Sequence, residues 1–105
     1  MSYPTPKLRK YMREHDDKTI ILDLGIVVTT ANAQREIAHV DIFNALERHK
    51  RGDWGDVCEG DAAANDAAIE NSEQVLSVYS SDGAKFWIIT EHDRSVTTIL
   101  LPSDY

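Results

Sequence analysis

The last third of the chain, QVLSVYSSDGAKFWIITEHDRSVTTILLP, constrains the fold most, because it predicts a three-stranded antiparallel meander. Residues 75–79, 85–90 and 95–101 are rich in β-branched and aromatic side chains, which favour strands. Between the first two segments, Asp82-Gly83 is the dipeptide of a tight type I′ hairpin, whose central residues both take positive φ. The segment therefore predicts a stably folded sheet, and it carries no recognisable catalytic motif.

The turns also predict a pairing register. The hairpin places Ser81 opposite Ala84, and a second, poorer turn dipeptide at His92-Asp93 would fold the third strand back on the second. The predicted pairs are Val78 with Trp87, Leu76 with Ile89, Ile89 with Val96, Trp87 with Thr98, and Glu91 with Arg94.

This register divides the side chains of the meander between two faces. One face predicts a hydrophobic core and comprises Leu76, Val78, Trp87, Ile89, Val96 and Leu100. The other face mixes apolar with hydroxyl side chains and comprises Tyr79, Phe86, Ile88, Ile99, Ser77, Thr90, Ser95 and Thr97. It is too apolar to remain in water, so either another element or a partner covers it. One alternative is a homodimer joined through Tyr79, Phe86, Ile88 and Ile99.

The first 17 residues contain two prolines and many charges, which predicts a basic, mobile arm (residues 1–17) before a single domain (residues 18–105). The apolar segments 19–22 and 26–30 predict a hairpin or one long strand bulged at Gly25. Thr30 is placed to cap a short helix through ANAQREI.

Two further helices are predicted before the meander. Asp41 would cap IFNALERHK, whose basic end suits the helix dipole, and Gly52 would end that helix. Asp56 and Glu59 have capping-box spacing and would open a third helix to about Ile69. The sequence thus predicts an α+β domain. Its antiparallel sheet has about four or five strands with a C-terminal three-stranded meander, and two or three helices pack on one face.

Length and composition limit the class of protein. The 105 residues suffice for one domain with its own core, and the single Cys58 excludes an intramolecular disulfide or a thiolate metal cluster. There is neither a signal-like segment nor an apolar run of membrane-spanning length, so we expect a cytoplasmic protein. The net charge of −7 is uneven: residues 1–52 hold nine Lys/Arg and seven Asp/Glu, and residues 53–105 hold two and eleven.

The acidic third helix is the main candidate site. On a helical wheel five carboxylates fall within a sector of about 100°, which would form an acidic row. Trp54, which precedes this row, is either a lid over the core or an interface anchor. Such a row could imitate phosphates and occupy a basic groove, whereas the alternative is a solvated helix face. The predicted partner-binding residues are Trp54, Asp56, Glu59, Asp66, Glu70 and Glu73. Direct contact with nucleic acid is expected only through the basic arm (Lys7, Arg9, Lys10, Arg13).

Other constellations are weaker. The string DWGDVCEGD does not match the EF-hand spacing, and Cys58 has the setting of a small helix residue, so no metal site, cofactor or catalytic thiol is predicted. The turn His92-Asp93-Arg94 offers an imidazole, an acid and a guanidinium, which a metal-independent ribonuclease toxin would need. That toxin remains the alternative, although the acidic surroundings would repel RNA.

The strings GDWGDVCE and KFWIITEHDRSVTTILLP resemble a widespread family of small bacterial proteins, often labelled plasmid-related, that mobile genetic elements carry. The resemblance covers roughly residues 22–105 and implies no catalytic residues. It implies a place on plasmids, integrated elements or phages. Together with the acidic row, it favours a non-enzymatic interaction protein that binds, and could inhibit, a nucleic-acid-processing or host-defence complex such as restriction or CRISPR machinery.

Overall fold

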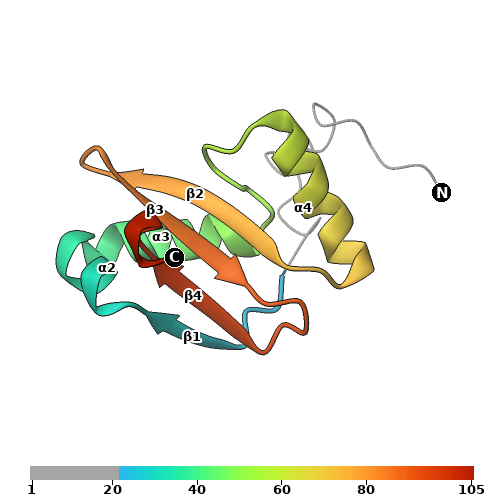
Figure 1. The fold of residues 1–105 in the computed structure, drawn as a ribbon, viewed down its shortest axis with the longest axis horizontal. Helices are drawn as coiled ribbons and strands as arrows, with labels where there is room; N and C mark the ends of the chain where they lie inside the picture. Colours follow the sequence, from blue (N-terminus) through green and yellow to red (C-terminus); the bar gives the residue numbers. More distant parts are fainter. Residues whose placement is uncertain (1–21) are drawn as a thin grey trace.

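The structure, a computed structural model, describes residues 22–105. Figure 1 shows a sheet with helices against one face and a further helix beside one edge. The elements in chain order are β1 (Ile26–Thr29), α2 (Ala31–Glu36), α3 (His39–Lys50), α4 (Glu59–Asn71), β2 (Val75–Ser81), β3 (Ala84–Thr90), β4 (Val96–Leu100) and the 3₁₀ turn η1 (Pro102–Asp104). No helix in this part of the chain is long and apolar enough to cross a membrane. The predicted boundary between arm and domain lies outside the described residues.

The predicted α+β class is confirmed, and the sheet has the order β1-β4-β3-β2. The three C-terminal strands form the predicted antiparallel meander. β1, in contrast, pairs parallel with β4, so the sheet is mixed. β1 begins directly after Gly25, whose φ of 61° turns the chain, and Leu22 belongs to no strand. The other residues of the predicted segment 19–22 lie outside the described part of the chain.

The first hairpin is confirmed and the second is wrong by two residues. Asp82 and Gly83 have φ of 49° and 80°, and Val78 pairs with Trp87 as predicted. Between β3 and β4, however, the partners are Trp87 with Leu100 and Ile89 with Thr98. The connection is a longer loop in which the Glu91 N–H bonds the Val96 carbonyl at 3.0 Å, so Glu91 does not face Arg94. A shift of two residues preserves the faces, because side chains alternate with period two.

The main core lies on the opposite face of the sheet from the one predicted, because α2 and α3 cover that face; of the two alternatives for it, cover by another element is confirmed. Their cluster with the sheet buries Tyr79, Phe86, Ile88 and Ile99 to 2% exposure or less. These four side chains therefore cannot form a homodimer interface in the folded protein. On the face predicted to be the core, Leu76, Val78, Trp87 and Val96 are only partly buried, whereas Ile89 and Leu100 are buried.

The hydroxyl groups on the helix-covered face are satisfied by a buried histidine. His49 of α3 is fully buried, with Nδ1 at 2.5 Å from the Ser77 hydroxyl and Nε2 at 2.8 Å from that of Thr90. Thr90 bonds Thr97 at 2.8 Å, and Thr97 donates to the Leu24 carbonyl at 2.7 Å. A polar chain thus crosses β2, β3 and β4, and lets hydroxyl-rich strands face the core.

The helix starts agree with the sequence in one case out of three. Thr30 caps α2 as predicted, and its Oγ1 accepts the Ala33 N–H at 3.2 Å. α3 starts earlier than predicted, with Ala38 as N-cap. Asp41 lies in its first turn and accepts a hydrogen bond from the Ser81 hydroxyl, so a tertiary contact has replaced the predicted cap. α4 is capped by Cys58, not by Asp56, so the predicted capping box is not formed.

Candidate partner-binding site

Two of the predicted contact residues are part of the core. Trp54 and Asp66 are 2% and 1% exposed, and the Trp54 indole donates to the Asp66 carboxylate at 3.1 Å. An indole N–H removed from water needs an acceptor, and Asp66 of α4 supplies it. The helical wheel missed this because it assigns every carboxylate to solvent. Both residues therefore hold α4 against the fold and cannot contact a partner at the surface.

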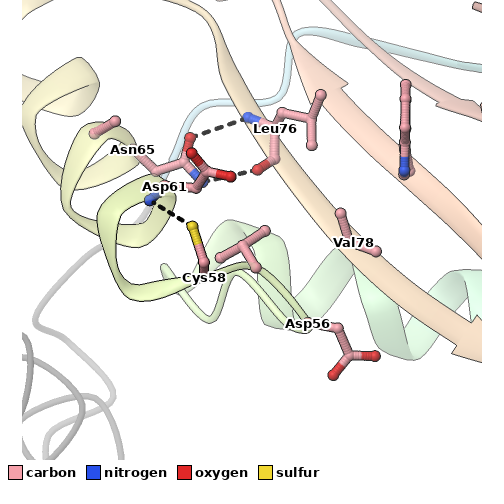
Figure 2. A pocket seen from close by; sticks show the side chains of 9 residues that line it. Asp56, Cys58, Asp61, Asn65, Leu76 and Val78 are labelled. Carbon is pink, nitrogen blue, oxygen red and sulfur yellow. Dashed lines mark hydrogen bonds between the residues drawn. The ribbon is translucent and has the colours of Figure 1, made fainter.

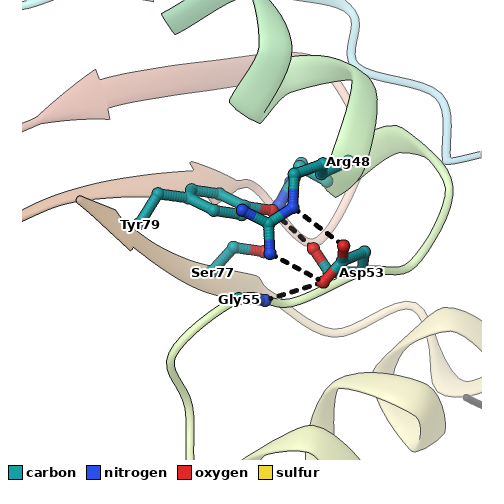
Figure 3. A network of polar contacts seen from close by, with 6 residues as sticks. Arg48, Asp53, Gly55, Ser77 and Tyr79 are labelled. Carbon is teal, nitrogen blue, oxygen red and sulfur yellow. Dashed lines mark hydrogen bonds and ion pairs between the residues drawn. The ribbon is translucent and has the colours of Figure 1, made fainter. Parts of the chain in front are cut away.

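The GDWGD segment is fixed by an ion pair at the end of α3 (Figure 3). Arg48 donates twice to the Asp53 carboxylate, at 2.8 and 3.2 Å, and the carboxylate also accepts the Gly55 N–H at 3.2 Å. Tyr79 donates to the Asp53 carbonyl at 2.6 Å, and the guanidinium lies 4.9 Å from the centre of its ring. The hydrogen bond to Asp53 raises the pKa of Arg48, and burial raises the pKa of Tyr79.

The same segment closes the β2 edge of the sheet. Val78 donates its N–H to the Trp54 carbonyl at 3.1 Å, and its carbonyl accepts the Asp56 N–H at 2.7 Å. Gly55 between them has φ of 73°, and a Cβ there would lie 2.0 Å from the Val78 oxygen. The chain can approach β2 this closely only because residue 55 has no side chain. Asp56 is thereby fixed in a loop before α4, outside the predicted helix.

A groove of about 400 Å³ lies between this loop, the start of α4 and the exposed sheet face. Figure 2 shows it from close by: β2 crosses behind it, and α4 forms one wall. Its floor is apolar, from Leu76, Val78 and Trp87. Two exposed carboxylates, Asp56 and Asp61, lie at its rim. The arrangement combines an apolar surface with two exposed carboxylates, of which Asp56 also lies within the electrostatic reach of Arg48.

The walls of the groove are held by local hydrogen bonds. Asn65 is 7% exposed and pairs with the backbone of Leu76 in both directions, donating to its carbonyl at 2.7 Å and accepting its N–H at 3.2 Å. The exposed Cys58 accepts the Asp61 N–H at 3.4 Å as the helix cap. Asp61 and Asn65 were not predicted as site residues. The Cys58-to-Asp61 spacing, which matches an N-cap and its third helical residue, could have identified Asp61. Asn65 has no local signal, because its partner is the Leu76 backbone on β2.

The remaining predicted acids are exposed but do not form one row. Glu59 and Glu70 lie on α4, and Glu73 lies beyond its end. The predicted row is interrupted because Asp66 is buried between Glu59 and Glu70, and because Asp56 precedes the helix. Of the predicted set, the structure brings only Asp56 to the groove, together with Asp61, which was left out.

Two residues of the alternative catalytic site, Asp93 and Arg94, hold the loop and the end of α4, whereas His92 is exposed in the same loop. Arg94 donates to the carbonyls of Ala68 and Glu73, at 2.9 and 2.6 Å, and so caps the C-terminal end of α4. Asp93 accepts from the backbone and hydroxyl of Ser95, which lowers the pKa of its carboxyl. Within residues 22–105, no three His, Cys, Asp or Glu side chains are grouped as metal ligands.

The chain matches no protein-family model, no curated protein and no solved structure.

Proposed function

We propose that this is a non-enzymatic interaction protein of mobile elements. It binds a basic surface of a nucleic-acid-processing or host-defence complex through the groove between α4 and the sheet, and inhibits that complex. The observation that carries the proposal is the apolar floor of Leu76, Val78 and Trp87 beneath the rim carboxylates of Asp56 and Asp61. The place on mobile elements rests on the sequence resemblance alone.

The chemistry of the groove specifies the partner segment. A volume of about 400 Å³ is within the range of pockets that hold small ligands, and it accommodates one or two side chains. An apolar or aromatic side chain would rest on Trp87, since aromatic residues in partly buried pockets contribute strongly to binding. Lys or Arg on either side of it would pair with Asp56 and Asp61. The preferred partner is therefore a basic segment with an apolar anchor.

Electrostatics supports the same partner. Between Gly52 and Ala84 the chain has no Lys or Arg, so the carboxylates around the groove have no basic neighbour in sequence. The exposed Glu59, Glu70 and Glu73 extend this negative surface along α4. A field of one sign speeds encounter with a basic protein and repels nucleic acid. Salt screens such attraction, so binding should weaken as ionic strength rises.

The test is affinity capture of the tagged protein from a host lysate at low and high salt. The groove variant is Asp56→Asn with Asp61→Asn. The matched control, Glu36→Gln with Glu47→Gln, removes the same charge from exposed positions on α2 and α3. The proposal predicts that one nucleic-acid-handling complex is recovered by wild type and control, and that the groove variant and high salt reduce recovery at least tenfold. Equal recovery by the two double variants would contradict it.

A further inference from the structure

The two edge strands of the sheet, β1 and β2, differ in whether their outward backbone groups have hydrogen-bond partners. The β2 edge is closed, because Val78 pairs with the segment around Gly55 and Leu76 pairs with the Asn65 side chain. β1 forms the other edge, and Figure 1 shows it as the outermost strand of the sheet. Among residues 22–105, no backbone hydrogen bond reaches its outer side. An unpaired edge is a template for a further strand.

The pairing of β1 with β4 shows which backbone groups of β1 point outward and can pair with a further strand. Ile26 and Thr30 direct their N–H groups inward, to the carbonyls of Ser95 and Ile99, both at 2.9 Å. Because backbone groups alternate in direction along a strand, Val27 and Thr29 direct N–H and C=O outward. Edge strands are normally protected by shortness, charge, proline or a bulge; β1 is short, with four residues, but residues 26–30 carry no charge, proline or bulge.

The edge is also apolar. Ile26, Val27 and Val28 are 68%, 43% and 42% exposed. On α3, Val40 and Phe43 are each 63% exposed. These five account for all but one of the exposed large hydrophobic side chains in the described part of the chain; the other is Tyr105.

The exposed side of α3 faces the same edge. Arg48 and Asp41, on one side of the helix, contact Tyr79 and Ser81 of β2. At 100° per residue, Phe43 lies on the opposite side, toward β1. A hollow between β1, α2 and α3, lined by Thr29, Gln34, His39 and Ile42, lies on this side of the helix. The exposed edge and Phe43 therefore belong to one side of the molecule, whereas Val40 points away from the sheet.

We propose that a second copy of this chain pairs with β1 in antiparallel fashion about a two-fold axis at Val28. Val27 of each copy then lies opposite Thr29 of the other, and their outward groups form four hydrogen bonds. The two sheets become one eight-stranded sheet, with both α3 helices on the same face beside the axis. No like charges meet between the two paired β1 strands, because residues 26–30 are uncharged.

A second copy suits this side better than an extended peptide. A peptide would satisfy the edge of β1 and leave Phe43 in water. A second copy brings its own α3 below its own strand, so the edge and Phe43 are covered at once. Such a self-complementary patch is the defining feature of a two-fold interface.

Sedimentation equilibrium up to millimolar concentration tests the dimer. Val28→Lys would place two like charges opposite each other at the axis, where cross-strand neighbours are closest. Its matched control, Ser80→Lys, adds the same charge at an exposed position on the other edge strand. We expect a dimer for wild type and Ser80→Lys, and a dissociation constant at least tenfold higher for Val28→Lys. A wild-type monomer throughout the range, or equal association of both variants, overturns the proposal.

Disulfide trapping tests the register in the same full-length protein with Cys58→Ser. At a non-hydrogen-bonded antiparallel pair the Cα atoms lie about 4.5 Å apart, within the range that a disulfide spans. Dioxygen, with copper as catalyst, takes up the two protons and two electrons that two thiols lose when they form one disulfide. This oxidation should therefore cross-link Val28→Cys to its own copy. Val27→Cys, which lies opposite Thr29, should remain reduced. Equal cross-linking of both variants, or of neither, contradicts a two-fold axis at Val28.

Discussion

At the scale of single residues, the protein depends on a histidine that stays neutral. The Thr97 hydroxyl donates its hydrogen bond to the Leu24 carbonyl, so the Thr90 hydroxyl must donate to Thr97, and the Nε2–H of His49 must donate to Thr90. The Ser77 hydroxyl then donates to Nδ1. Only one assignment of donors and acceptors satisfies this row of hydrogen bonds, and it places the proton of the neutral His49 ring on Nε2. Burial, with a smaller contribution from the positive charge of Arg94, lowers the pKa of His49 to about 3.

This pKa makes stability depend on pH in a defined window. In the unfolded chain His49 becomes protonated near its ordinary pKa of 6.5, whereas in the folded protein its pKa is about 3. The unfolded state thus binds more protons, and stability falls as pH falls through this interval, by up to about 1.4 kcal/mol per pH unit. We expect urea unfolding from pH 6.5 to pH 5 to show this slope in wild type. His49→Gln should be less stable at pH 7 but lack the slope, and equal slopes would contradict a neutral buried His49.

At the scale of the elements, the closed β2 edge depends on a glycine and an asparagine. Gly55 and Gly83 have similar positive φ, of 73° and 80°, but only at Gly55 does a Cβ meet the backbone. We expect Gly83→Ala to cost about 1 kcal/mol through strain alone. Gly55→Ala should cost more than about 3 kcal/mol, because the Val78 carbonyl must also move. Equal unfolding midpoints for the two variants would show that the loop does not pair with β2 as described.

Asn65 closes the next position of that edge. Asn65→Ala removes both bonds to Leu76 and leaves a partly buried N–H and C=O unpaired, so we expect a loss of about 2 kcal/mol. Amide hydrogen exchange should accelerate at Leu76 by more than tenfold. Asn44→Ala, an exposed position on α3, is the control and should change neither quantity. Unchanged exchange at Leu76 in Asn65→Ala would contradict this role.

The elements also show how far sequence reasoning reaches. The Asp82-Gly83 turn predicted the β2–β3 register because the signal is local: one dipeptide determines both φ values and the pairing. The β3–β4 register failed because loop length there depends on Asp93 and Arg94, which bond across the loop and to distant carbonyls. The sequence left open whether another element or a partner covers the hydroxyl-bearing face, because nothing local shows that the buried His49 pairs with Ser77 and Thr90. Of the six residues predicted to bind a partner, only Asp56 lines the groove, and Trp54 and Asp66 pair with each other in the core.

At the scale of the whole molecule, the two proposed surfaces lie at opposite edges of the sheet. The groove lies beside β2 and is acidic, whereas the β1 edge is uncharged and apolar. A dimer through β1 would therefore present two grooves on the same face, at the two ends of the joined sheet, and a partner with two basic segments would bind by avidity. Loss of the dimer should weaken capture of such a partner, with each groove unchanged.

The most direct test of partner binding uses the chain's own cysteine, since Cys58 is exposed and lines the groove. A photoactivatable maleimide attached to Cys58 is irradiated in host lysate, with or without high salt. The control carries the same label on Cys58→Ser with Glu36→Cys, on α2. The account predicts that the Cys58 label cross-links a nucleic-acid-handling protein through a basic segment, in a salt-sensitive manner, and that the α2 label does not. The same cross-links from both labels, or none from Cys58, would contradict a partner-binding groove.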